Sequence, residues 1–227
     1  MHKTFNPVVH QIVITLLLAI PCVGQSIPEA FGSIARIESD SGRGTGFVVA
    51  TRGEKFELWT NAHVVRNQRT VNLRFFAGTS REFSTSGIVV WSKYDGTRDA
   101  AKIISTSGEA IRPFRISDKA CDNCIFATAG YPSGQRGYSI LLSPTPRLDF
   151  GPVAAYLPSS IPGQSGSPVV DRDGTVTHVV TLRAKREGVM IGGALPISHW
   201  ADGDSFETST SEPGIGFFQP LPNAPND

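Results

Sequence analysis

The chain has 227 residues, of which 40% are hydrophobic and 18% are charged, a balance that suits a folded globular protein and argues against a disordered one. Its formal net charge of +1 gives no reason to expect a nucleic-acid or membrane-surface partner. The 23 glycines and 16 prolines indicate many turns, as in an all-β chain, and the length allows one large domain or two small ones.

Residues 1–25 have the pattern of an export signal. Lys3 is the only Lys or Arg before an apolar run from Ile12 to Val23, which two residues interrupt. The run is shorter than the roughly 20 apolar residues that a membrane-spanning helix needs, and Gly24 is a small residue that suits the cleavage site. We therefore expect a secreted or periplasmic protein with no stable membrane insertion after signal removal, the alternative being a buried or anchoring segment.

From Ser33 onward, short β-rich runs alternate with turn residues. A first group of six strands is expected at residues 33–38, 45–50, 56–61, 71–76, 84–91 and 100–104, with one helical turn at 62–65. A second group of six is expected at residues 125–129, 138–143, 152–157, 167–171, 175–183 and 189–195. Regular short strands with Gly and Pro turns predict an all-β barrel or sandwich. Asp, Ser, Thr, Pro and Gly dominate residues 201–227, which predicts a mostly disordered tail.

Ser165 lies between two glycines in Gly163-Gln164-Ser165-Gly166, one two residues before it and one directly after it. An apolar run follows. Glycine tolerates a tight turn, and such a turn can aim backbone N–H groups at one point. A cluster of this kind binds the negative oxygen that develops when a serine attacks a carbonyl. Glycines beside a serine are also common in ordinary loops, so the motif needs a base and an orienting carboxylate elsewhere.

His63 and Asp99 are the candidates for those two roles. His63 lies in Thr60-Asn61-Ala62-His63-Val64-Val65 after an extended run, and imidazole titrates near neutral pH. Asp99 begins an apolar run, whereas the rival Asp95 precedes a glycine in a turn pattern. The chain order His, Asp, Ser is one of several that build a catalytic triad. The other histidines fall in the signal (His2, His10) or in packing or surface positions (His178, His199).

Three motifs stand out, at residues 44–49 (GTGFVV), 60–65 (TNAHVV) and 163–170 (GQSGSPVV). Together they resemble the motifs of the trypsin-like serine endopeptidases, and most of all those of the bacterial HtrA-type and glutamyl-endopeptidase-type branches. The resemblance covers roughly residues 32–197. It implies a protease domain at 26–200 with two six-stranded antiparallel β-barrels, at about 32–110 and 120–197, and an active site in the cleft between them. Residues beyond 200 leave no length for a peptide-binding PDZ domain like those of many HtrA-type proteases.

The resemblance also implies the function, an exported serine endopeptidase that hydrolyses peptide bonds through an acyl-enzyme. Ser165 would be the nucleophile, His63 the base and Asp99 its orienting carboxylate. The backbone N–H groups of Gly163 and Ser165 would form the oxyanion hole. No metal or organic cofactor is expected, and the partner would be a protein or peptide substrate.

Two positions depart from the family's pattern. Lys102 stands where the family usually has an apolar residue, and we expect it to extend outward at a strand edge. Gln164 stands where many digestive members have an aspartate that pairs with a freed N-terminus. Because Gln164 cannot form that ion pair, we predict no activation by N-terminal insertion beyond signal removal.

Specificity residues are assigned only by similarity. The base of the substrate pocket would lie near Ser159, and its walls would include Thr181, Leu182 and Arg183. No acidic residue stands at the expected base, which argues against a preference for Lys or Arg. Val180 aligns with a wall position where glutamate-specific relatives carry a histidine. A small or medium apolar preference is the remaining expectation.

Cys121 and Cys124 form a Cys-Asp-Asn-Cys sequence. In an exported chain the expected state is a small local disulfide. A thioredoxin-like redox role is disfavoured because no βαβ pattern surrounds the pair, and a zinc site is disfavoured because no second Cys or His pair follows. A loop this short removes little entropy from the unfolded state, so the bridge should stabilise the fold only slightly.

Two alternative functions stay open at this point. The first is a protease-like module that captures peptides without turnover, against which stands the presence of all three triad residues. The second is an acyl hydrolase of the α/β class, whose Gly-x-Ser-x-Gly turn needs its second glycine two residues after the serine. Position 167 is a serine, and the chain order also differs from that class.

Overall fold

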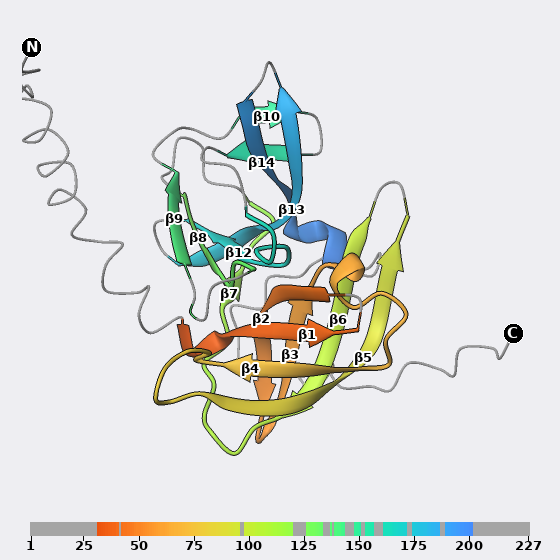
Figure 1. The fold of residues 1–227 in the computed structure, drawn as a ribbon, viewed down its shortest axis with the longest axis vertical. Helices are drawn as coiled ribbons and strands as arrows, with labels where there is room; N and C mark the ends of the chain where they lie inside the picture. The colour runs from red at the N-terminus through yellow and green to blue at the C-terminus, as the bar shows by residue number, and fades with distance from the viewer. Residues whose placement is uncertain are drawn as a thin grey trace, which may run out of the picture.

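The computed structural model describes residues 31–201 except 41, 96–97, 120–125, 134–136, 138, 144–147, 151–152, 157–160, 172–173 and 187–188. Strands form nearly all of its regular structure (Figure 1), as predicted. The helices in this part of the chain are short 3-10 turns: η1 (Phe31–Ser33), η2 (Ala62–Val64) and η3 (Ile197–Trp200). None of the helices in these ranges is long and apolar enough to cross a membrane. The expected signal, Cys121, Cys124, Ser159 and the expected tail beyond 201 lie outside the described residues.

The first barrel is closed and contains the six predicted strands. They are β1 (Ile34–Ser39), β2 (Gly42–Arg52), β3 (Lys55–Thr60), β4 (Thr70–Phe75), β5 (Phe83–Tyr94) and β6 (Asp99–Thr106). Their order is β1-β2-β3-β6-β5-β4, and β4 pairs back onto β1 with Ala35 opposite Phe75. Every pairing in this barrel is antiparallel. Closure leaves the six strands without an exposed edge.

The interior of the first barrel follows from the period of two in its strands. Alternate residues of β4 (Val71, Leu73, Phe75) and of β3 (Phe56, Leu58) are buried together in one hydrophobic cluster. Successive side chains of a strand point to opposite faces of the sheet, so these residues fill the barrel. The cluster comprises Ala35, Ile37, Val48, Phe56, Leu58, Val64, Val65, Val71, Leu73, Phe75, Ala101 and Ile103.

The second half of the chain forms one eight-stranded sheet. Its strands are β7 (Arg115–Ile116), β8 (Phe126–Gly130), β9 (Ser139–Ser143), β10 (Leu148–Phe150), β11 (Val153–Tyr156), β12 (Pro168–Val170), β13 (Thr175–Arg186) and β14 (Val189–Pro196). The order is β10-β11-β14-β13-β12-β8-β9, with β7 paired to β13 off this path. The six predicted strands are present, and β7 and β10 are additional.

The prediction of a second six-stranded antiparallel barrel is met only in part. Among the described residues, the ladders of the second sheet run in an open order from β10 to β9. β7 lies parallel to β13, with Thr175 opposite Arg115, so the sheet is not purely antiparallel. The strand β7 comes from the segment between the two predicted groups, where no strand was expected.

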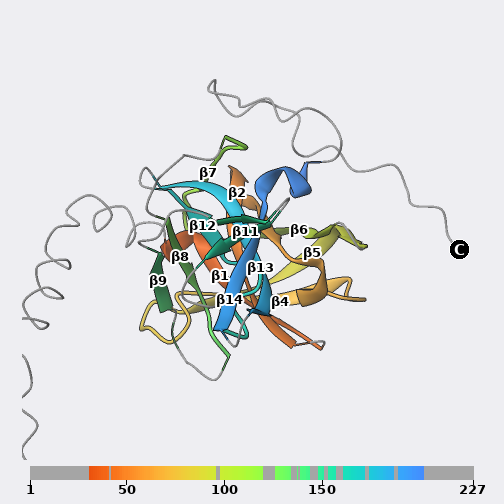
Figure 2. The ribbon, with the colours of Figure 1, turned by 90° about the horizontal axis from the view of Figure 1, so that it is seen from above.

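A second hydrophobic cluster joins the two halves. The outer face of the first barrel contributes Phe47, Trp59 and Ala100. Each of them is adjacent in sequence to a residue that points into the barrel, namely Val48, Leu58 and Ala101. The three outer-face residues pack with residues of the second half: Val176, Val179, Leu195, Ile197 and Trp200. Figure 2, turned by 90° from Figure 1, shows β13 and β14 lying over the barrel. This packing places the ends of β3 and β6 against the second sheet.

Candidate active site

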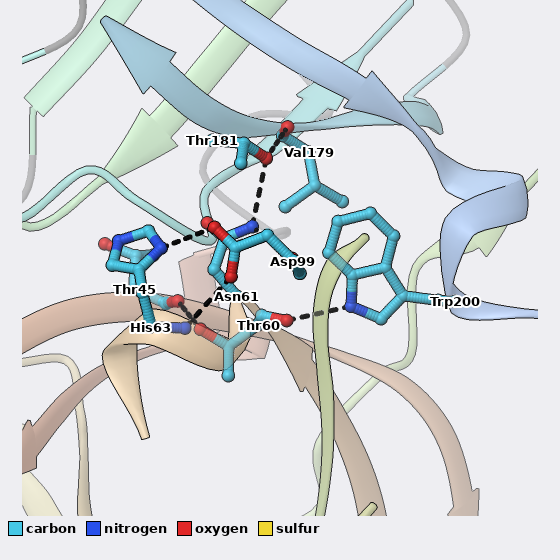
Figure 3. A network of polar contacts seen from close by, with 8 residues as sticks. All are labelled: Thr45, Thr60, Asn61, His63, Asp99, Val179, Thr181 and Trp200. Carbon is cyan, nitrogen blue, oxygen red and sulfur yellow. Dashed lines mark hydrogen bonds and ion pairs between the residues drawn. The ribbon is translucent and has the colours of Figure 1, made fainter. Parts of the chain in front are cut away.

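His63 and Asp99 meet at one end of the first barrel. His63 lies on η2, directly after β3, and Asp99 is the first residue of β6, the neighbour of β3 in the barrel. His63 Nδ1 lies 2.6 Å from Asp99 Oδ2, and the backbone N–H of His63 donates to Asp99 Oδ1 at 2.9 Å (Figure 3). Both oxygens of one carboxylate thus bind one residue, which fixes the imidazole in position and in orientation.

This contact also decides which ring nitrogen carries the proton. An ionised carboxylate can only accept hydrogen bonds, so Nδ1 of the neutral His63 ring is the donor and Nε2 keeps its lone pair. The side chain of Asp99 is only 12% exposed, whereas that of His63 is 37% exposed. The carboxylate is therefore shielded from water while the imidazole remains open to a reactant, which is the arrangement a general base needs.

Asn61 links this pair to the second sheet. Its buried Nδ2 donates to the backbone carbonyl of Asp99 at 2.9 Å and to Oγ1 of Thr181 at 3.0 Å. Thr181 lies at a register shift in the β13–β14 ladder, and its hydroxyl donates to the carbonyl of Val179 at 2.9 Å. A bulge re-aims a side chain in this way. The sequence motif contained Asn61, but nothing near it identified a partner 120 residues away.

Trp200 braces the residue at the end of β3. Its indole N–H donates to the carbonyl of Thr60 at 2.8 Å, and the hydroxyl of Thr60 donates to the carbonyl of Thr45 at 2.6 Å. All three side chains are fully buried. Figure 3 shows these contacts beneath His63 and Asp99. The strand end that leads into η2 is therefore held by both halves of the molecule.

Ser165 lies in a tight loop at residues 161–167. Gly163 has φ +92°, a conformation that residues with a Cβ rarely adopt. The backbone N–H of Gln164 donates to the carbonyl of Ile161 at 3.0 Å, and the Ile161 N–H donates to Oε1 of Gln164 at 2.8 Å. The Gln164 side chain is fully buried. The residue before Ser165 thus folds back onto its own loop with a neutral side chain.

This loop docks on β2 of the first barrel. The backbone N–H of Thr45 donates to the carbonyl of Ser165 at 2.8 Å, and the hydroxyl of Thr45 donates to the carbonyl of Gly163 at 2.9 Å. A Cβ added at Gly44 would lie 2.5 Å from Cγ1 of Val64 and 3.1 Å from the Ser165 oxygen. The backbone of Ser165 is therefore close to the residue that follows His63, although 102 positions separate Ser165 from His63 in sequence.

Two backbone donors of the loop are available for a ligand. The N–H of Gln164 donates to Ile161 and that of Gly166 to Val180. The N–H groups of Gly163 and Ser165 donate to no acceptor within the described ranges. Unused N–H groups on both sides of Gln164 are what binding of a developing oxyanion requires.

The structure describes some of the other predicted site residues and leaves one of them outside its range. Thr181 is buried against Asn61, while Leu182 and Arg183 continue β13 opposite Gly193 and Gly192. Ser159 lies outside the described residues, so the predicted pocket base has no structural description. The described part of the chain holds no group of three or more His, Cys, Asp or Glu placed to bind a metal ion.

Asp95 and Lys102 were also singled out in the sequence, as the rival carboxylate and as a departure from the family's pattern. Asp95 pairs with Lys93 at 3.3 Å and accepts the backbone N–H of Arg98 at 2.8 Å, so it belongs to a turn and Asp99 is the carboxylate that contacts His63. Lys102 Nζ lies 5.7 Å from the ring centroid of Trp59 and 5.5 Å from that of Trp91. Lys102 thus lies on the face opposite to the interior residues Ala101 and Ile103, but it packs between two indoles and not at a strand edge, because β6 is paired on both sides.

Known structures share this fold. The human astrovirus serine protease is 23% identical, covers 73% of this chain and 90% of its own, and has a TM-score of 0.55. A protease of M. tuberculosis in an inactive form is 24% identical over 78% and 90% of the two chains, with a TM-score of 0.59. A serine endoprotease from Yersinia pestis is 17% identical over 77% and 62%, with a TM-score of 0.60. No curated protein shows significant sequence similarity to the chain.

The family model for the trypsin-like peptidase domain matches residues 44–177, which span β2 to the start of β13 and contain all three predicted triad residues. That range is more than half of the chain, and the fold agrees with it independently. The resemblance inferred from the three sequence motifs is therefore confirmed. The chain belongs to the trypsin-like peptidase family.

Proposed function

We propose that this peptidase is an exported serine endopeptidase that cleaves peptide bonds through an acyl-enzyme intermediate. The observation that carries the proposal is the two-point contact between His63 and Asp99, which leaves the lone pair of Nε2 free to act as a base. Ser165 is the nucleophile, His63 the base and Asp99 the group that orients His63 and stabilises its protonated form.

The reaction proceeds in two similar halves. Ser165 Oγ bonds to the substrate carbonyl carbon while its proton passes to His63 Nε2, and the carbonyl oxygen becomes negative. The N–H groups of Gly163 and Ser165 bind that oxygen. The C–N bond then breaks as Nε2 returns the proton to the leaving nitrogen. Water attacks the resulting ester by the same route and frees Ser165.

Further features complete the proposal. The second sheet closes into a second barrel, with the substrate in the cleft between the two barrels. Thr181, Leu182 and Arg183 line one wall of the specificity pocket and Ser159 its base. A small or medium apolar side chain of a protein or peptide substrate fits there, because no acidic residue is expected at that base.

Labelling of the serine separates an active enzyme from an inactive peptide-binding module. The purified wild type should react with a fluorophosphonate probe and cleave members of a peptide library, and Ser165→Ala should do neither. The cleavage profile then reports the pocket preference. Binding of peptides by a wild type that neither reacts with the probe nor cleaves would replace the proposal with the module.

Export has its own support and its own test. Lys3 and the apolar run from Ile12 to Val23 have the arrangement of a signal peptide, and an oxidising compartment suits a disulfide between Cys121 and Cys124. Expression of the full chain in a bacterial host should yield a secreted or periplasmic form that begins near residue 26. Thiol titration of that form should find no free cysteine until a reductant is added. A product that keeps residues 1–25 in the cytoplasm would contradict export.

A further inference from the structure

We propose that the hydroxyl of Thr45 is a positioning group that holds the oxyanion hole in shape from the first barrel. The inference deepens the proposed function and rests on it, since it assigns the control of the Gly163 donor to a residue 118 positions away. Thr45 does not touch the reacting atoms. It acts through two backbone segments of the second half.

The hydroxyl of Thr45 makes two hydrogen bonds at once. It accepts the backbone N–H of Tyr131 at 2.9 Å and donates to the carbonyl of Gly163 at 2.9 Å. A hydroxyl has one proton, and the amide N–H can only donate, so the direction of both bonds is fixed. The side chain is fully buried, so water does not compete with either partner.

The segment that Thr45 holds also sets the direction of the Gly163 N–H. Two residues after Tyr131, the backbone N–H of Ser133 donates to the carbonyl of Pro162 at 2.6 Å. Pro162 and Gly163 share one peptide plane, and a trans peptide points its N–H opposite to its C=O. Holding the carbonyl of Pro162 on one side therefore turns the N–H of Gly163 to the other.

Thr45 thus restrains the Pro162–Gly163 peptide, which donates to the oxyanion, on both of its flanks. It fixes Gly163 directly, and it fixes the 131–133 segment that anchors the carbonyl of Pro162. Without the hydroxyl, the buried carbonyl of Gly163 and the N–H of Tyr131 both lose a partner, which costs free energy until the segments move. A shift of about 1 Å in a positioning element can reduce turnover about 10²-fold.

The experiment compares Thr45→Val, which keeps the shape of the side chain without the hydroxyl, with Thr45→Ser, which keeps the hydroxyl. We expect kcat to fall about tenfold to hundredfold in Thr45→Val with KM within about threefold, because the lost geometry serves the transition state. Thr45→Ser should stay within about threefold of wild type, on the same reasoning. Equal kcat values for the two variants would overturn the proposal.

Ser105→Ala controls for loss of a buried hydroxyl as such. The hydroxyl of Ser105 donates to the carbonyl of Ser86 at 2.7 Å on strands of the same barrel. Its removal should lower the melting temperature to an extent comparable with Thr45→Val while leaving kcat unchanged. A fall in kcat equal to that of Thr45→Val would show that stability alone explains the effect and would overturn the proposal.

A second pair of variants tests the same geometry away from the core, in case Thr45→Val does not fold. Ser133 is exposed, and only its backbone N–H holds Pro162. Ser133→Pro removes that donor and Ser133→Ala keeps it, so kcat should be at least about tenfold lower in the proline variant. Similar kcat values for both would contradict the control of the Gly163 donor by this segment.

Hydrogen exchange separates a failure of this inference from a failure of the proposed function. The Tyr131 amide should be protected in wild type and Thr45→Ser and should exchange faster in Thr45→Val, whether or not the protein cleaves peptides. If wild type fails to react with a fluorophosphonate while this pattern holds, the proposed function is wrong and the structural role of Thr45 stands. Unchanged protection in Thr45→Val would overturn that role itself.

Discussion

The first barrel and the loop at residues 161–167 support the two parts of the candidate site in different ways. In the first barrel, continuous antiparallel ladders carry β3 and β6 side by side, and His63 and Asp99 lie at their ends. The loop has no ladder of its own. A few hydrogen bonds hold it, to Thr45 of the first barrel, to Ser133 and to Val180 of β13.

The His63–Asp99 pair and Ser165 therefore depend on different kinds of interaction for their positions. The His63–Asp99 pair inherits its position from strand pairing and a filled barrel interior, which many contacts share. The geometry around Ser165 depends on a few buried polar contacts, where one lost partner exposes an unsatisfied group. Substitutions in the two regions should therefore fail in different ways.

Asp99→Asn tests the first-barrel part of the site. An asparagine presents an N–H₂ group where Asp99 now accepts two hydrogen bonds, so His63 is held in the wrong tautomer. We expect kcat to fall about 10⁴-fold, the loss that the same substitution causes in a known triad. The matched control is Asp95→Asn, four residues away in a turn, with kcat within about twofold of wild type by the same criterion. A loss of less than about tenfold for Asp99→Asn would remove Asp99 from the proposed triad.

Gly163→Val tests the loop part. A Cβ at position 163 would lie 2.5 Å from both the Ser133 nitrogen and the Tyr131 oxygen, and φ there is +92°. The peptide must move, and kcat should fall by about 10²–10³, the effect of losing one oxyanion donor. Gly53→Val is the control, because Gly53 also has a positive φ, of +58°, but has nothing within 4 Å of an added Cβ. Its kcat should match wild type, and equal kcat losses would point to general strain.

Trp200→Phe tests the connection between the two halves of the molecule. The phenyl ring fills most of the same space but cannot donate to the carbonyl of Thr60, which stays buried without that donor. The free energy of unfolding, measured in urea, should fall by about 1–3 kcal/mol. An unchanged free energy of unfolding would mean that the hydrogen bond between η3 and β3 adds nothing to the cohesion of the two halves.

Lys102→Met should have the smallest effect. The substitution keeps an unbranched side chain between Trp59 and Trp91 but removes the charge over the two rings. The melting temperature should drop by an amount equivalent to about 0.5–1 kcal/mol, the usual value of a cation–π contact at a partly exposed site. A more stable Lys102→Met would indicate that the family's usual apolar residue fits this barrel better than the lysine.

The local sequence pattern was enough to predict most of the first barrel and to identify His63 and Asp99 as a pair. Alternating apolar residues such as Val71, Leu73 and Phe75 predict a strand with one buried face wherever the strand is placed, because the period is a property of the backbone. The contrast between Asp99 before an apolar run and Asp95 before a glycine was likewise local, and it selected the carboxylate that contacts His63. The three motifs that identify the family are also local, since each is a short continuous stretch of sequence.

Tertiary structure alone decided how the two halves meet. The contacts of Thr45 with Gly163, of Asn61 with Thr181 and of Trp200 with Thr60 span 118 to 140 residues. No window of sequence contains both partners of such a contact, and a threonine in an apolar strand has the same local pattern whether or not it has a partner. The parallel pairing of β7 on β13 is of the same kind, because strand order depends on which edges remain open once the sheet has assembled. Short stretches of sequence thus determine which residues make up the candidate site. Contacts that form only when the chain has folded determine how those residues are aligned.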